Sequence, residues 1–164
     1  MESYRMKMLR TIFPFCIAIF HAYLWAANTT ADPFLGRWVL DVRTSHYAAK
    51  TCPKSMTIEM TQAPRGVHYQ SHTEPAVGEA FDVEYTADYD SKPTIVTGSK
   101  GILLPVSLQR KGDAIIATFR NAFRVAATSE RVLSDHDHTM TITTVSYDSA
   151  GNAVTNVGVY RKAK

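Results

Sequence analysis

Cysteine is scarce in this sequence of 164 residues, which contains Cys16 and Cys52 and no other thiol. Two cysteines, one of them within the first 27 residues, cannot form a disulfide framework or a cysteine-based zinc site. Cys52 is therefore either a small buried hydrophobic side chain or a thiol that pairs between chains. The fold has to be held together by its core.

The motifs of common catalytic and cofactor sites are missing as well. The sequence has no Gly-x-Ser-x-Gly, no His-Glu-x-x-His, no phosphate-binding loop and no dinucleotide fingerprint. Outside the first 27 residues, which hold three basic residues and one acidic residue, 15 basic and 14 acidic residues remain. This near-neutral remainder has no basic cluster, which argues against nucleic acid as a partner. We expect no cofactor.

An apolar leader is present at the N-terminus. Three basic residues precede the apolar stretch 12–25, and Ala27 supplies a small residue for cleavage. The stretch is shorter than the ~20 residues that span a bilayer. We predict a signal peptide over residues 1–27 and an exported domain over residues 32–164, periplasmic or secreted and without a membrane span. An uncleaved anchor is the alternative.

Alternation of apolar and polar residues dominates the remainder. From Phe34 to Val42, every second residue is apolar or glycine, so Gly36 and Trp38 share one face of a predicted strand. No segment shows a convincing helical period. The short segments and their regular spacing predict an all-β fold of antiparallel strands, closed into a barrel that leaves few exposed edges. The predicted strands are 34–42, 55–62, 67–73, 80–87, 94–97, 102–110, 114–120, 123–133, 139–147 and 153–161.

The first and last of these strands resemble those of a known superfamily. Gly36-x-Trp38 after an apolar leader is similar to the opening of lipocalins and fatty-acid-binding proteins, the calycins, and residues 157–162 resemble their closing strand. Residues 32–162 as a whole resemble exported bacterial proteins with lipocalin-like barrels. The resemblance implies an up-and-down barrel of eight to ten strands around a cavity for a small hydrophobic or amphipathic ligand.

The resemblance also assigns roles to single residues. It implies that Trp38 packs near the closed end of the barrel, beside Gly36, and that Arg161 covers the indole by a cation–π contact. Two features depart from fatty-acid-binding proteins. Residues 43–54 are too few for their two-helix lid, and their Arg-x-Tyr carboxylate clamp keeps only Tyr160, because Gly158 stands at the arginine position.

Candidate ligand contacts follow from the alternation. Apolar and aromatic side chains on the inward faces either line a cavity or fill a core. A buried arginine needs an acidic or hydrogen-bonding partner, which an acidic ligand would supply. For Arg120 and Arg124, an outward position on a hairpin is the plainer alternative. The candidates are Met56, Ile58, Tyr69, Phe81, Tyr85, Arg120, Arg124 and Tyr160.

Two pairs of histidines and one pair of acidic residues could in principle bind a metal or act in catalysis, but each pair has a simpler structural interpretation. His136 and His138 could ligate a metal, but they stand in a predicted turn. His68 and His72 are four residues apart on a strand, ~13 Å, which is too far for one metal. The adjacent acids at positions 82 and 84 alternate with apolar residues, as on a solvated outer face. We assign no metal site and no catalytic residue.

Three functions remain open at this level. The first is a binding protein that holds a small hydrophobic or amphipathic molecule. The second is a filled barrel that acts as an envelope or interaction protein without a ligand. The third is a barrel-type lyase or isomerase, which would need two titratable groups that converge in one cavity. The inward-facing residues favour the first.

Overall fold

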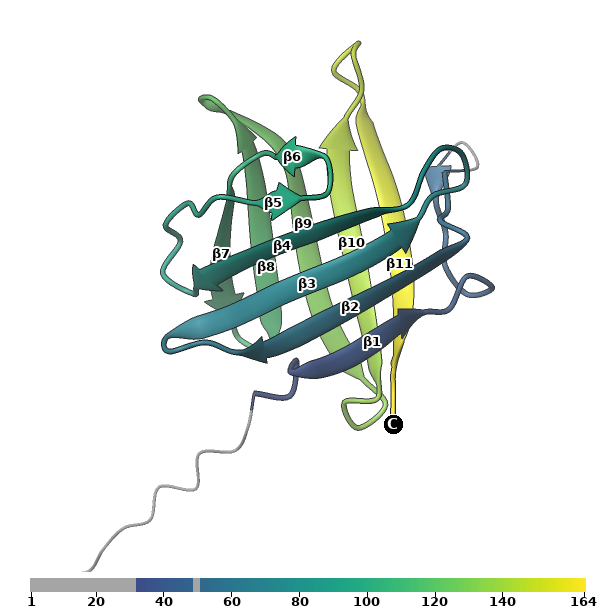
Figure 1. Cartoon of the computed structure of the whole chain (residues 1–164), viewed down its shortest axis with the longest axis vertical. Coiled ribbons are helices and arrows are strands. Elements are labelled where there is room, and N and C mark those ends of the chain that lie inside the picture. Colours follow the sequence, from purple (N-terminus) through teal and green to yellow (C-terminus); the bar gives the residue numbers. More distant parts are fainter. Residues whose placement is uncertain (1–31, 49–50) are drawn as a thin grey trace, which may run out of the picture.

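The computed structural model describes residues 32–48 and 51–164, which form one antiparallel sheet of eleven strands (Figure 1). The predicted signal peptide lies outside the described residues. Within them, no helix has the length and hydropathy that crossing a bilayer requires. The strands are β1 (Gly36–Leu40), β2 (Ser55–Gln62), β3 (Gly66–Glu74), β4 (Phe81–Asp88), β5 (Thr97–Gly98), β6 (Gly101–Ile102), β7 (Val106–Lys111), β8 (Ala114–Asn121), β9 (Arg124–Ser134), β10 (Thr139–Tyr147) and β11 (Ala153–Lys162).

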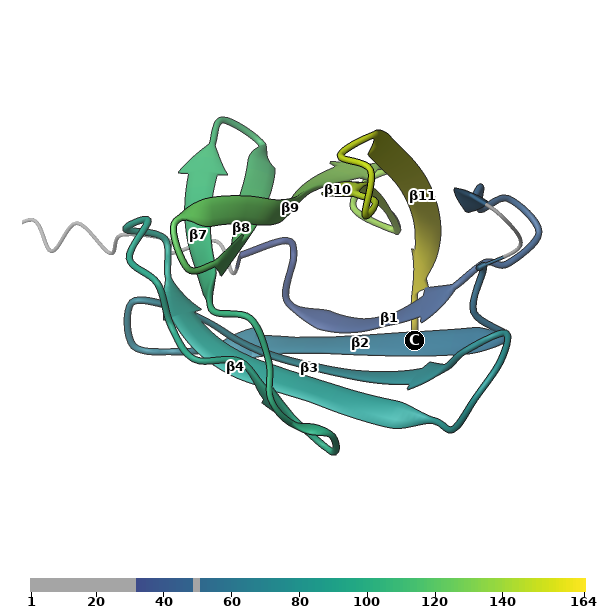
Figure 2. The ribbon, with the colours of Figure 1, turned by 90° about the horizontal axis from the view of Figure 1, so that it is seen from above.

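The sheet curls into a barrel. Its strand order is β6-β5-β4-β3-β2-β1-β11-β10-β9-β8-β7, so the first strand pairs with the last. Strands β1 to β4 face strands β7 to β10 across the interior (Figure 2). On the side where β4 and β7 approach each other, the connection that follows β4 pairs with β7 through isolated bridges, Thr94 with Val106 and Asp90 with Gln109. The predicted all-β antiparallel barrel is confirmed. It has eleven strands because the connection between β4 and β7 contains the two-residue strands β5 and β6.

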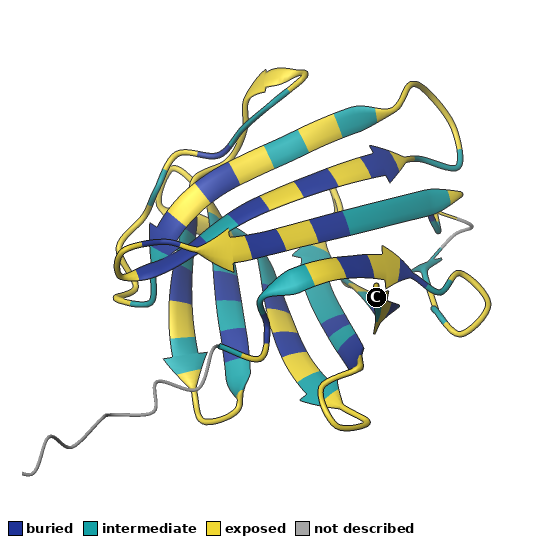
Figure 3. Cartoon of the chain, turned by 60° about the horizontal axis from the view of Figure 1, so that its bottom comes forward, coloured by how far each residue is buried: buried dark blue, intermediate teal, exposed yellow. Residues whose placement is uncertain are grey.

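Alternation along the strands builds the core (Figure 3). Trp38 is fully buried, and its indole Nε1 donates a hydrogen bond of 2.9 Å to the carbonyl oxygen of Phe34, while Val39 on the other face is 41% exposed. Burial of a hydrogen-bonded indole makes this residue a strong anchor for the sheet. Around it lie other fully buried side chains, including Phe34, Ile58, Met60, Leu108, Ile115 and Met140.

Lys162, and not Arg161, covers the indole of Trp38. Its Nζ lies 5.0 Å from the ring. Trp38 is the register partner of Lys162, so both side chains leave the sheet on the same side, whereas Arg161 pairs with Val39 and contacts Thr139 and Asp41. The expectation for Arg161 was wrong by one residue, which on a strand means the opposite face.

Gly36 accommodates this arrangement. Its φ of 120° lies in a region that L side chains rarely adopt, and a Cβ at this position would lie 3.2 Å from Cε of Lys162. A side chain here would therefore strain the backbone and crowd the lysine that covers the indole.

Arg110, which has an acidic partner, ties the first described residues to the sheet. Arg110 on β7 pairs with Asp32 at 2.6 Å, and its guanidinium lies 5.1 Å from the ring centroid of Phe34 and 5.0 Å from that of Tyr89. The hydroxyl of Tyr89 also donates to Asp32, at 3.0 Å. The charge of Arg110 is thus balanced within the protein.

Candidate functional site: a cavity crossed by a buried arginine

A cavity of about 490 Å³ lies inside the barrel. This volume is within the range of roughly 300–1,000 Å³ that ligand pockets occupy. No Asp or Glu of the described residues lines it. The lining is mostly apolar and aromatic and comes from both walls: Tyr47, Pro53, Met56, Tyr69, Ser71, Thr73, Phe81, Val83, Tyr85, Val96, Leu103, Leu104, Phe119 and Arg131.

Arg131 reaches across the interior from β9. The residue is 3% exposed. Its Nη2 donates a hydrogen bond of 2.7 Å to the hydroxyl of Tyr85 on β4, and its guanidinium lies 4.9 Å from the ring centroid of Tyr69 on β3. The two tyrosine rings stack with their centroids 4.7 Å apart. The stacked pair of Tyr69 and Tyr85 on one wall of the barrel thus holds the guanidinium of Arg131, which extends from the opposite wall.

The charge of Arg131 is only partly compensated. Its Nε and Nη1 are buried and find no hydrogen-bond partner among the described residues. Burial alone would lower the pKa of Arg131, but the interactions with Tyr85 and Tyr69 outweigh it and the net shift is upward, so the group stays charged. A buried cation with two unsatisfied donors is costly, by several kcal/mol in typical cases. An anionic group of a ligand can accept a charge-assisted hydrogen bond from either donor.

Neutral phenols surround the guanidinium. Burial raises the pKa of Tyr47 and Tyr160, and it raises the pKa of Tyr69 to about 12. These hydroxyls therefore remain protonated at neutral pH, where they act as hydrogen-bond donors and not as bases. The hydroxyl of Tyr160 donates to Sδ of Met56 at 3.2 Å. Together with Arg131, this set of groups is suited to hold an anion.

A second, smaller cavity of about 270 Å³ opens beside Arg131. It shares several walls with the first, namely Tyr47, Met56, Tyr69, Phe119 and Arg131. Its remaining lining is more polar and comes from β9, β10 and β11: Ser129, Ile142, Thr144, Asn156 and Tyr160. Arg131 therefore stands at the junction of an apolar space and a more polar one.

The structure separates the predicted contact residues into three groups. Ile58 is fully buried in the core. Arg120 and Arg124 are exposed and flank the tip of the β8–β9 hairpin, where Phe123 is also fully exposed, so neither arginine lines the cavity. The remaining candidates do line the cavities: Met56, Tyr69, Phe81 and Tyr85 the larger, and Met56, Tyr69 and Tyr160 the smaller.

Sequence reasoning missed Arg131 and Tyr47. Arg131 lies in the predicted strand 123–133, where Ser129 and Leu133 share its face and Glu130 and Val132 share the other. Both faces mix apolar and polar residues, so alternation alone does not show which one points inward. Tyr47 lies in an irregular segment, and only the folded chain brings it to the cavity.

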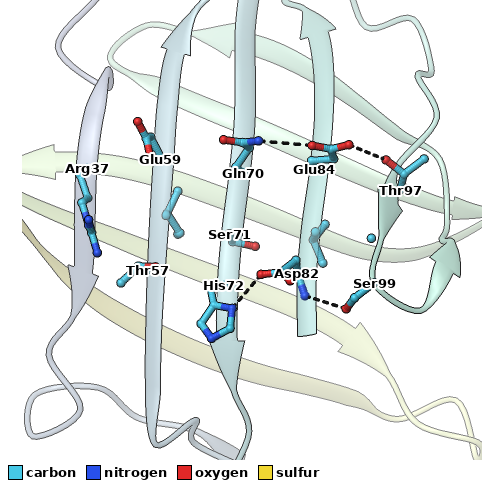
Figure 4. A pocket seen from close by; sticks show the side chains of 13 residues that line it. Arg37, Thr57, Glu59, Gln70, Ser71, His72, Asp82, Glu84, Thr97 and Ser99 are labelled. Atoms are coloured by element: carbon cyan, nitrogen blue, oxygen red, sulfur yellow. Dashed lines mark hydrogen bonds and ion pairs between the residues drawn. The ribbon is translucent and has the colours of Figure 1, made fainter. Parts of the chain in front are cut away.

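The polar groups weighed for chemistry lie on the outer surface. A hollow of about 500 Å³ on the outer face of β1 to β5 contains two polar rows (Figure 4). In one row, Nδ1 of His72 lies 2.7 Å from Oδ1 of Asp82, and in the other, Gln70 donates to Glu84 at 3.3 Å. These side chains are exposed, as expected for an outer face.

The turn between β9 and β10 contains the histidine pair. His136 and His138 are both exposed there, and His136 has a φ of 51°. Within residues 32–48 and 51–164, no group of three His, Cys, Asp or Glu side chains is placed to hold a metal. Cys52 is half-buried, and burial raises the pKa of its thiol.

Comparison with solved structures supports the fold. A fatty-acid-binding protein of Echinococcus granulosus aligns with a TM-score of 0.55 and 12% identity, covering 82% of this chain and 100% of its own. A zebrafish ileal bile-acid-binding protein in complex with cholic acid aligns with a TM-score of 0.54 and 11% identity, covering 80% and 99%. A point mutant of the fluorescent protein UnaG aligns with a TM-score of 0.55 and 14% identity, covering 82% and 99%.

No family model and no curated sequence matches the chain. At identities this low, the structural likeness establishes the barrel architecture and leaves function to be argued from the cavity.

Proposed function

We propose that the chain is a binding protein for a small amphipathic acid, whose apolar part fills the larger cavity and whose carboxylate pairs with Arg131. The observation that carries the proposal is the pair of unsatisfied donors on Arg131, buried at the wall of a mostly apolar cavity. Nε and Nη1 lie on different edges of the guanidinium, each beside Nη2, so the carboxylate would accept a charge-assisted hydrogen bond from the donor on one of these edges.

The solved structures of similar fold support this choice of ligand class. Two of them are a fatty-acid-binding protein and a bile-acid-binding protein in complex with cholic acid. Fatty acids and bile acids both combine an apolar body with a carboxylic acid. The cavity volume of about 490 Å³ disfavours the alternative of a filled barrel. A carrier of this kind needs no base, which agrees with the protonated phenols around the guanidinium.

Calorimetric titration with two matched probes tests the proposal. Lauric acid and dodecanol have chains of the same length, but only the acid carries a charge. We expect wild-type protein to bind lauric acid and the Arg131→Met variant to bind it about 100-fold more weakly, since loss of one partner of a buried charge pair costs roughly 2–5 kcal/mol. Binding of dodecanol should not weaken in the variant.

The control is Arg124→Met, which removes an exposed arginine from the same strand and should leave both affinities unchanged. Equal affinity of wild type and Arg131→Met for lauric acid would refute the role of Arg131. Failure of both probes to bind the wild-type protein would refute the proposed function itself.

A further inference from the structure

The smaller cavity has a polar wall formed by residues that are in register across three strands. Ser129 on β9 is opposite Thr144 on β10, and Thr144 is opposite Asn156 on β11. All three side chains line the cavity. Arg131 stands two residues further along β9, on the same face as Ser129, so the polar row runs ~7 Å from the row of the guanidinium.

This row offers hydrogen-bond donors that the protein leaves free. Thr144 donates to the hydroxyl of Ser129 at 3.3 Å, and the side-chain oxygen of Asn156 accepts from the backbone of Ala48 at 2.9 Å. The hydroxyl proton of Ser129 and the amide protons of Asn156 have no acceptor among the described residues. Among the described residues, the enclosed side-chain atoms without a partner are both on Arg131, so the donors of Ser129 and Asn156 are not sealed off and are available to an acceptor in the cavity.

A simple fatty acid would leave this wall unused. Its carboxylate ends the molecule, so once the acid pairs with Arg131 and the chain occupies the apolar space, nothing enters the smaller cavity. Its volume of about 270 Å³ and its polar row fit a short substituent beyond the carboxylate. The distance of ~7 Å between the two rows suits a substituent of a few bonds that ends in a carbonyl.

Building on the proposed function, we infer that the preferred ligand carries its carboxylate within the molecule and not at its end. An apolar chain lies on one side of the acid and a short polar arm with a hydrogen-bond acceptor lies on the other. An N-acyl amino acid with a polar side chain has this form. Its acyl chain fills the larger cavity, its carboxylate pairs with Arg131, and its side-chain carbonyl accepts from Ser129 and Asn156.

Competition titrations with three probes test the inference: lauric acid, N-lauroyl-L-norleucine and N-lauroyl-L-glutamine. The two acyl amino acids differ in the polarity of side chains of similar length. Wild-type protein should bind the glutamine derivative at least about ten-fold more tightly than the norleucine derivative, a typical value for one or two added hydrogen bonds.

The double variant Ser129→Ala, Thr144→Val removes the hydroxyls with little change of volume and should reduce this preference to less than about two-fold. Its affinity for lauric acid should equal that of wild type, which shows that the barrel is intact. Thr143→Val, which removes a hydroxyl from the opposite face of β10, should keep the full preference.

The outcomes separate the inference from the function on which it depends. Equal binding of the two acyl amino acids by wild type, or an unchanged preference in the double variant, overturns the inference while binding of lauric acid still supports the proposed function. If neither lauric acid nor the two acyl amino acids bind, the inference and the proposed function are both refuted.

Discussion

At the scale of the residue, Arg131 combines features that a structural arginine would not need. It is buried, it contacts the ring of Tyr69 and the hydroxyl of Tyr85, and two of its nitrogens have no partner among the described residues. Replacement of buried charges by apolar residues of similar volume is often neutral or stabilising, by roughly 1–4 kcal/mol. The unpaired guanidinium is therefore a stability cost, and the binding function that we propose would explain it.

The cost of the unpaired guanidinium predicts how a substitution of Arg131 changes the stability of the ligand-free protein. Arg131→Met should be at least as stable as wild type, and up to about 2 kcal/mol more stable, because methionine fills the space without an unsatisfied charge. Denaturation by urea, followed by tryptophan fluorescence, measures the difference. A loss of more than about 2 kcal/mol would mean that Arg131 mainly supports the barrel and would contradict its assignment to a ligand.

At the scale of the element, Arg110 on β7 can be compared with Arg131 on β9, because both are arginines that lie against aromatic rings. Arg110 has what Arg131 lacks, a carboxylate at 2.6 Å, from Asp32. Both arginines lie against aromatic rings at similar distances, 5.0–5.1 Å and 4.9 Å. The ion pair, and not the aromatic packing, is therefore what distinguishes the arginine that ties two segments together from the one that we assign to a ligand.

The contrast predicts opposite effects of the same substitution. Arg110→Met leaves the half-buried Asp32 without its cation and should destabilise the protein by about 1–3 kcal/mol, a reduced value because the pair is partly exposed to solvent. The same urea titration measures it. Restored stability in the double variant Arg110→Met, Asp32→Asn would confirm that the unpaired carboxylate is the cause, and no effect of the single variant would rule it out.

Elements were more predictable from the sequence than the site. Strands such as 55–62 and 139–147 match the structure because strict alternation with one buried face leaves little choice of pairing. Arg161 was misplaced by a single position, which the register of β1 and β11 decides. Arg131 and Tyr47 could not be assigned, because their role depends on contacts with strands that are distant in sequence.

At the scale of the whole molecule, buried phenols couple stability to alkaline pH. Burial raises the pKa of Tyr69 from 10 to about 12. The unfolded chain releases this proton near pH 10 and the folded protein only near pH 12, so the stabilising effect is complete below pH 10 and disappears as pH rises through 12. This tyrosine alone should account for about 3 kcal/mol across that window.

Unfolding free energies measured between about pH 9 and pH 12 check this expectation. Wild type should lose stability steeply, and the Tyr69→Phe variant should lose about 3 kcal/mol less over the same range. Identical pH profiles for the two proteins would show that Tyr69 is not buried in solution as the fold requires.

The most direct test of ligand capture by the buried arginine is a crystal structure of the protein with lauric acid. We predict that the carboxylate lies about 2.8 Å from Nε or from Nη1 of Arg131, with the alkyl chain between the two walls of the larger cavity. A carboxylate bound at the exposed Arg120 or Arg124, with the donors of Arg131 still unpaired, would contradict this assignment.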